Sequence, residues 1–257
     1  MVTKDILSPC GPNVINPGDN GEDSFDAGYS RKVISAMSHE LFSSIAAISS
    51  NIQLFRRFRY DMDQTVRDEC FSLCDDSVKD IFRFLDNVQL LNAINKSGIK
   101  LEKVPLNLRK FIYQLCKDPV LVNLDSSRIL LKWNLNDRIV LCDKRALTRV
   151  LIHSIGNALK FSRDPVRVVV SASNYELSVI VQDYGIGIPE EQIEQVFQPF
   201  YRASNVGHIS GVGLGLAIVY SLVQKLDGKI RMSSAIGEGV TIQMNIPYGL
   251  STKDSVN

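Results

Sequence analysis

Two long apolar stripes at helical spacing constrain the fold of this chain more than any other feature of its sequence. Apolar residues recur every three or four positions from Val33 to Phe55 and again from Val66 to Leu91, with the polar stretch 59–64 between them. This pattern predicts two long helices joined by a short loop. Each helix carries an apolar seam that a single hairpin cannot cover. We therefore expect two copies of the chain to pair as a four-helix bundle, a homodimer.

The rest of the chain divides around this hairpin. Residues 1–28 are rich in Pro, Gly, Asp and Asn and predict a flexible leader, and the hairpin occupies residues 29–100. A second domain is expected over residues 104–248, followed by a frayed tail at 249–257. In the first half of this second domain we expect a strand and a helix in 106–117, strands at 128–135 and 138–142 joined at Asn136-Asp137, and a helix capped by Asp143. In its second half we expect antiparallel strands at 167–172 and 177–182, a helix beginning at Pro189, and strands at 229–234 and 239–247.

Composition excludes several classes of protein. The chain has 257 residues and a net charge of +1, which gives no reason to expect a nucleic-acid partner. No apolar run approaches the roughly 20 residues needed to span a bilayer, and no secretory signal is recognisable. The five cysteines form no compact framework, which fits a reducing cytosol. We expect a cytoplasmic protein with no membrane span in this chain.

The segment Gln182-Asp-Tyr-Gly-Ile-Gly-Ile-Pro189 follows a predicted strand and has the properties of a ligand site. Asp183 could accept a hydrogen bond from an exocyclic amine such as that of adenine. Gly185 and Gly187 let a flat ligand approach the main chain. Taken alone, this segment is more typical of an Asp-Gly turn between two elements than of a ligand site.

Two further stretches carry groups that suit phosphate. His153, Asn157 and Lys160 share one side of the helix that Asp143 caps. Downstream, Gly211, Gly213 and Gly215 stand at the start of an apolar helix, where glycines expose backbone N–H groups to anions; a dinucleotide-binding unit is disfavoured because no strand directly precedes them. The polar segment from Arg202 to Ser210 lies between these stretches and is expected to form a mobile lid.

These stretches occur in the order found in GHKL ATP-binding domains, and Met37-Ser-His39-Glu40-Leu41 is similar to the phosphoacceptor box of histidine kinases. Residues 30 to 248 as a whole resemble a sensor histidine kinase core. The resemblance implies an α+β fold: a helical hairpin forming a dimeric four-helix bundle, followed by an α/β sandwich of the Bergerat ATP-binding type. In that sandwich, helices cover one face of a mixed sheet.

The resemblance also implies the roles of the site residues. Asn157 matches a Mg²⁺ ligand, Lys160 a residue that meets phosphate, Phe161 an aromatic beside adenine, and Thr241 a threonine near the adenine-binding Asp183. Arg202, at the start of the lid, joins the expected nucleotide-binding set. His153 stands where the family commonly has Asn, so it is either a phosphate-contacting residue or a helix residue at the pocket rim. If protonated it would bind phosphate as a cation, and affinity would fall as pH rises through about 6.5.

The implied activity is transfer of the ATP γ-phosphoryl group to His39, which should face solvent because it lies off the apolar seam, and then to an aspartate on a response regulator receiver domain. Glu40 can fix the imidazole tautomer. Ser43 occupies a position that helps dephosphorylation in the family, and Ser44 replaces a helix-bending proline.

Two alternatives remain open from the sequence. A GHKL ATPase that hydrolyses ATP would carry a Glu where His153 stands. A non-catalytic or phosphotransfer adaptor could keep the fold while losing the kinase reaction.

Overall fold

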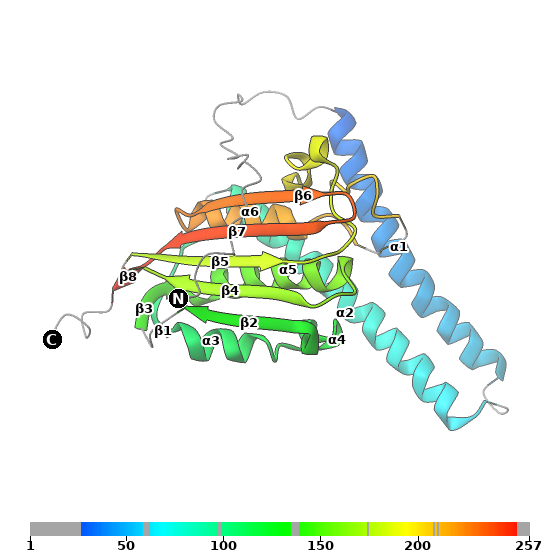
Figure 1. Cartoon of the computed structure of the whole chain (residues 1–257). Coiled ribbons are helices and arrows are strands. Elements are labelled where there is room, and N and C mark those ends of the chain that lie inside the picture. The colour runs from blue at the N-terminus through cyan, green and yellow to red at the C-terminus, as the bar shows by residue number, and fades with distance from the viewer. Residues whose placement is uncertain are drawn as a thin grey trace.

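The first part of the chain that the structure describes is a helical hairpin. The structure is a computed structural model that describes residues 27–58, 62–96, 99–134, 139–173, 175–207, 209 and 211–250. Helices α1 (Ala27–Phe58) and α2 (Gln64–Asn95) pack against each other, and the rings of Phe55 and Phe71 lie 5.3 Å apart near the turn (Figure 1). The predicted pair of helices is thus confirmed. The expected leader lies almost entirely outside the described residues.

The strands beyond the hairpin form two sheets. A small antiparallel sheet has the order β1-β3-β8 and a larger one the order β2-β4-β5-β7-β6. In the larger sheet β2 is parallel to β4 and the other neighbours are antiparallel, so the sheet is mixed, as expected. The strands are β1 (Lys103–Asn107), β2 (Ile129–Asn134), β3 (Ile139–Asp143), β4 (Val166–Ala172), β5 (Glu176–Gln182), β6 (Lys229–Ala235), β7 (Gly239–Pro247) and β8 (Gly249–Leu250).

Helices cover one face of the five-stranded sheet (Figure 1). They are α3 (Leu108–Leu115), α4 (Pro119–Asn123), α5 (Lys144–Phe161) and α6 (Gly215–Lys225), with a short 3₁₀ turn, η1 (Ser126–Arg128), before β2. Burial alternates along β4 and β5, as expected for strands with one covered face. The covered side chains, such as Val168 and Val179, join those of α5 and α6, such as Leu151 and Ile218, in one core. Burying this apolar surface is the main force that holds the sandwich together.

Strands β2 and β3 do not pair, although the sequence placed them on either side of one short connection. β2 runs parallel to β4, with Ile129 opposite Val166, whereas β3 pairs with β1 in the smaller sheet. The connection itself, residues 135–138, lies outside the described residues. The sequence marked both strands correctly but not their partners, because each partner lies elsewhere along the chain.

The prediction of a helix beginning at Pro189 is wrong. The structure has only two 3₁₀ turns there, η2 (Glu190–Gln192) and η3 (Gln195–Phe197). Val196 and Phe197 are buried in the core, and the ring centroids of Phe197 and Tyr220 lie 5.6 Å apart. This packing takes precedence over helix propensity in so short a segment.

The hairpin and the sandwich share a core in this arrangement. Phe84, Leu91 and Ile94 of α2 are buried in the same cluster as the helices of the sandwich, and α2 contacts α6. Met37 and Leu41 of α1 pack against that cluster. None of the described helices combines the length and the apolarity that crossing a bilayer would require.

Candidate functional site

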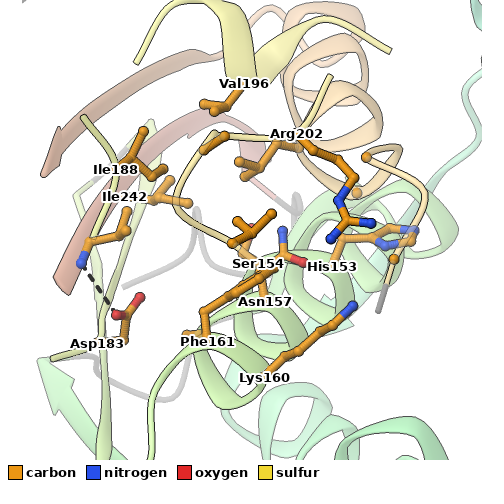
Figure 2. Close-up of a pocket in the computed structure, with 18 of the residues that line it drawn as sticks. His153, Ser154, Asn157, Lys160, Phe161, Asp183, Ile188, Val196, Arg202 and Ile242 are labelled. Atoms are coloured by element: carbon orange, nitrogen blue, oxygen red, sulfur yellow. Dashed lines mark hydrogen bonds between the residues drawn. The ribbon is translucent and has the colours of Figure 1, made fainter. Parts of the chain in front are cut away.

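Three segments that are far apart in the sequence meet around one cavity of about 230 Å³. They are one side of α5, the loop that follows β5, and the glycine-containing loop that leads into α6 (Figure 2). Ten of the twelve residues expected to bind nucleotide line this cavity: His153, Asn157, Lys160, Phe161, Asp183, Gly187, Arg202, Gly211, Gly213 and Gly215.

Helix α5 supplies the polar wall of the cavity. Its N-cap, Asp143, accepts a hydrogen bond from the backbone N–H of Ala146, as the sequence predicted. Leu147, Leu151 and Ile155 lock one side of the helix into the core. The opposite side therefore turns toward the cavity, and it presents the polar residues His153, Asn157 and Lys160 one turn apart.

Asp183 stands at the end of β5 and is only 6% exposed. Its Oδ1 accepts hydrogen bonds from the backbone N–H groups of Gly185 at 2.9 Å and Val240 at 3.3 Å. Burial raises the pKa of this carboxyl, while the two N–H groups oppose that change. Within the described residues Oδ2 accepts no hydrogen bond. A buried acceptor of this kind suits an amine donor on a ligand.

The glycines of the site meet physical requirements that other residues would not. Gly187 has a φ of 67°, and a Cβ there would lie 1.9 Å from the carbonyl oxygen of Ala235. Gly185 does not line the cavity; it packs on the end of α5, where a Cβ would lie 2.1 Å from the carbonyl oxygen of Phe161. Gly185 therefore allows close contact between the β5 loop and α5 rather than contact with a ligand.

Thr241 is likewise outside the cavity wall. It lies in β7 opposite Gln182, and its neighbours Val240 and Ile242 line the cavity instead. In this structure the main chain of β7, through the Val240 N–H, is what contacts Asp183.

The glycine loop lies directly against the polar side chains of α5. A Cβ at Gly211 would be 2.5 Å from the Lys160 Nζ, and one at Gly215 would be 3.2 Å from the Asn157 Nδ2. Gly213, with a φ of 75°, allows the loop to pass the carbonyl oxygen of Tyr201. An ammonium group, an amide and the N-terminal end of α6 thus face the same space, which suits an anionic ligand.

His153 is uncharged at neutral pH in this environment. Desolvation in the cavity wall, reinforced by the cation of Arg149, lowers its pKa to about 4, although Asp86 acts in the opposite direction. His153 keeps some accessible surface because it lines a cavity, but its surroundings are mostly protein atoms. The imidazole can therefore donate or accept a hydrogen bond, but the phosphate-binding cation considered from the sequence is not supported.

The segment expected to be a lid is tied to the cavity rim in its described part. The Arg202 Nη2 donates to the carbonyl oxygen of Ile209 at 2.6 Å, and the Asn205 Nδ2 donates to that of Gly187 at 2.9 Å. The Arg202 side chain points toward the side of the cavity that holds His153 and Asn157 (Figure 2). His208 and Ser210 lie outside the described residues, so the lid remains a prediction.

The residues expected to carry the phosphoryl group lie in α1. The side chains of His39 and Glu40 are outside the described ones, while Ser43 is exposed. The predicted orientation of His39 toward solvent therefore stays a prediction.

Sequence reasoning missed two kinds of wall residue. Apolar side chains such as Ile188, Met232 and Ile242 line the cavity, and nothing in their pattern separates them from ordinary core residues. Asn87 also lines it, from α2 in the hairpin. The contribution of Asn87 becomes visible only when the hairpin is packed against the sandwich, as it is in the structure.

Comparisons with known proteins place this site in a family. Residues 142–250 match the family described as "Histidine kinase-, DNA gyrase B-, and HSP90-like ATPase". The autoinducer 2 sensor kinase/phosphatase LuxQ of Vibrio cholerae is 28% identical over 86% of this chain and 26% of its own length. The sensor histidine kinase WalK of Bacillus subtilis is 27% identical over 87% of this chain and 38% of its own length. The chain thus spans well under half of each relative.

Solved structures support the fold. The histidine kinase AdeS of Acinetobacter baumannii superposes with a TM-score of 0.62 and 21% identity, covering 81% of this chain and 97% of that one. The histidine kinase ThkA, solved in complex with the response regulator protein TrrA, gives a TM-score of 0.59 and 21% identity over 84% of this chain and 61% of that one.

Residues 142–250 therefore form an ATPase-type domain of this family, built around the cavity described above. The similarity to sensor histidine kinases extends across the hairpin as well as this domain.

Proposed function

We propose that this chain is a histidine kinase that transfers the γ-phosphoryl group of ATP to His39 and passes it on to an aspartate of a response regulator receiver domain. The observation that carries the proposal is the single cavity where Asp183, Asn157, Lys160 and the glycine loop meet. The relatives that share both the hairpin and this domain are named sensor kinases, which supports the same activity.

In this proposal the two ends of the cavity bind different parts of ATP. Asp183 accepts a hydrogen bond from the adenine amine, between the apolar walls that Ile188 and Ile242 provide. Lys160 and the N–H groups before α6 bind the phosphates. Arg202 reaches the same end of the cavity from the lid segment (Figure 2).

The site fits Mg²⁺ through one protein ligand. The Asn157 amide faces the glycine loop and makes no hydrogen bond to any described residue. The described residues include no group of three or more His, Cys, Asp or Glu side chains that could hold a metal ion. The Asn157 oxygen would thus hold the ion together with phosphate oxygens and water, and Mg²⁺ would screen the phosphate charge.

The transfer itself requires His39 to act as a nucleophile. A neutral imidazole nitrogen of His39 attacks the γ-phosphorus, the bond to the β,γ-bridging oxygen breaks, and ADP leaves with the electron pair. Glu40 accepts the proton carried by the other ring nitrogen, which fixes the reactive tautomer. The phosphoryl group then moves to a receiver aspartate on a separate protein. ThkA, of the same fold, is described in complex with a response regulator.

Two further parts of the proposal concern assembly and location. The hairpin forms a homodimer through its exposed seams. The described cysteines Cys70, Cys74, Cys116 and Cys142 are all free thiols, which together with the need for ATP favours the cytoplasm.

Labelling with γ-³²P-ATP and Mg²⁺ tests the proposal. We expect acid-labile, base-stable label on the wild-type chain and none on His39→Gln, whose nucleotide affinity should stay near that of the wild type. Label that persists on His39→Gln would overturn the assignment of His39. Release of inorganic phosphate without protein label would favour a hydrolysing ATPase instead, and tight nucleotide binding with neither product would favour an adaptor.

A further inference from the structure

Helix α2 of the hairpin contributes one polar side chain to the wall of the nucleotide cavity. Asn87 lines the cavity and is half-buried. Within the described residues its side-chain amide makes no hydrogen bond. An amide in this position offers two N–H donors and a carbonyl acceptor to whatever occupies the cavity.

Contacts on both sides of Asn87 hold α2 in place. Phe84, Leu91 and Ile94 bury their side chains in the core shared with the sandwich, and this apolar contact supplies most of the docking energy. In addition, Asp86 binds the guanidinium of Arg149 on α5 through contacts of 2.8 and 3.4 Å. Because both partners of this ion pair are partly exposed, it contributes little energy, but it shows that Asp86 of α2 lies beside Arg149 of α5.

The ion pair shows which end of the cavity Asn87 occupies. Arg149 lies one turn before His153 on α5, whereas the loop carrying Asp183 packs on Phe161 at the other end of that helix. His153 and Phe161 are separated by about 12 Å along the helix axis. Figure 2 shows His153 and Asp183 on opposite sides of the cavity. Asn87 therefore lies at the end away from Asp183.

We propose that Asn87 is a nucleotide-binding residue supplied by the hairpin, with its amide donating a hydrogen bond to the phosphate chain of ATP. This inference rests on the proposed function, in which Asp183 binds the adenine. It has one consequence for the whole chain: triphosphate binding and docking of the hairpin stabilise each other, because the contact exists only when α2 is docked.

Binding measurements on the full chain test this contact. Calorimetry would compare a non-hydrolysable ATP analogue with adenosine for the wild type, Asn87→Ala and the control Asn92→Ala, which alters an exposed asparagine of α2 outside the cavity. We expect Asn87→Ala to weaken analogue binding about tenfold to a hundredfold, as for one lost hydrogen bond to a charged group, and to leave adenosine affinity unchanged. Asn92→Ala should match the wild type for both ligands.

A second pair of variants tests how α2 is held. Asp86→Asn removes the charge that binds Arg149, whereas Asp80→Asn removes the charge of an ion pair with Arg83 that lies within α2. We expect Asp86→Asn to weaken analogue binding about twofold to threefold with no change for adenosine, and Asp80→Asn to have no effect.

Three outcomes would overturn the inference in distinguishable ways. A wild-type chain that binds no adenine nucleotide would overturn the proposed function as well. Normal wild-type binding with an unchanged Asn87→Ala variant would overturn only the role of Asn87. An equal loss for adenosine and the analogue would show that Asn87 supports the fold of the cavity and does not bind phosphate.

Discussion

Asp183 is the residue whose environment most directly indicates a ligand. The backbone N–H groups of Gly185 and Val240 occupy one carboxylate oxygen, and the other faces the cavity without a hydrogen bond from the described residues. A carboxylate oxygen in this state at a cavity wall can accept a hydrogen bond from a donor on a ligand. The Asp-x-Gly-x-Gly segment alone did not predict this role, which was inferred only together with the stretches around Asn157 and Gly211, and the structure places Asp183 and Gly187 in the cavity wall.

We predict that Asp183→Asn weakens the binding of adenine nucleotides by about 1–3 kcal/mol, because the amide must turn its oxygen to the ligand and lose a contact elsewhere. The measurement is calorimetric titration with ADP. Asp164→Asn, which changes an exposed carboxylate near the end of α5, is the matched control. Equal affinities for the wild type and Asp183→Asn would exclude Asp183 as the adenine-binding residue.

The lowered pKa of His153 should make the free energy of unfolding depend on pH. Its ordinary pKa of 6.5 falls to about 4 in the folded chain, mainly through burial and also through Arg149. Between these values the unfolded chain binds more protons, so stability falls as pH falls from about 6.5 toward 4, by at most about 3 kcal/mol.

Urea unfolding of the wild type and His153→Asn from pH 4 to 8 measures this effect. The stability difference between the two proteins should be constant above pH 7 and should shift in favour of His153→Asn at lower pH. Nucleotide affinity of the wild type should not fall through pH 6.5 on account of His153. A stability difference that stays constant down to pH 4 would contradict the lowered pKa.

At the scale of elements, Arg128 ties the C-terminal end of α5 to the turn before β2. Its guanidinium donates to the carbonyl oxygens of Leu159 at 2.7 Å, Ser162 at 2.8 Å and Leu124 at 3.0 Å. The last carbonyl groups of a helix have no partner within the helix, so a side chain that binds them completes the helix end. Arg128 thereby positions Lys160 and Phe161, which line the cavity.

We predict that Arg128→Met lowers the free energy of unfolding by about 1–3 kcal/mol, because buried carbonyl groups lose their donors. Urea denaturation measures the change, and Arg163→Met, at an exposed neighbouring position, is the control. A loss no larger than that of the control would show that water replaces the guanidinium without cost.

Elements with strong periodicity were predictable, as were partners adjacent in sequence such as the antiparallel pair β4 and β5, but partners distant in sequence were not. The stripes of α1 and α2 and the alternation in β4 and β5 are local patterns, so the sequence shows them directly. Leu131 of β2 lies opposite Val168 of β4, although β3 and α5 separate the two strands in the sequence. No local sequence pattern predicts this pairing. The turns at Glu190–Gln192 and Gln195–Phe197 take their shape from the packing of Phe197.

The same reasoning applies to the site. Asn157, Lys160 and the glycines could be recognised because each motif is contiguous in sequence. Asn87 could not, because its place in the cavity wall depends on how α2 packs against the sandwich through Phe84, Leu91 and Ile94. The lowered pKa of His153 could not be predicted from the sequence either, because burial in the folded chain is its main cause.

At the scale of the whole molecule, the hairpin leaves much apolar surface uncovered. Among the seam residues, Ile45 is 52% exposed, Ile52 48%, Val66 43% and Leu73 56%, whereas Phe84 and Leu91 are buried against the sandwich. Exposed apolar groups that repeat along two adjacent helices indicate a surface that another molecule covers. A second copy of the hairpin carries the same repeating surface, so a two-fold arrangement can bury both.

We predict that the chain is a dimer in solution and that Leu73→Glu shifts it toward monomer, because a carboxylate buried in an apolar helix interface has no partner to offset its lost hydration. Sedimentation equilibrium of the wild type and the variant measures the dissociation constant, which should rise at least tenfold. Tyr175→Glu is the matched control, since Tyr175 is 72% exposed and lies beside β5, away from the hairpin. Circular dichroism should show that both variants stay helical. A monomeric wild type, or equal dissociation constants for the two variants, would contradict the dimer through the hairpin and with it the proposed four-helix bundle.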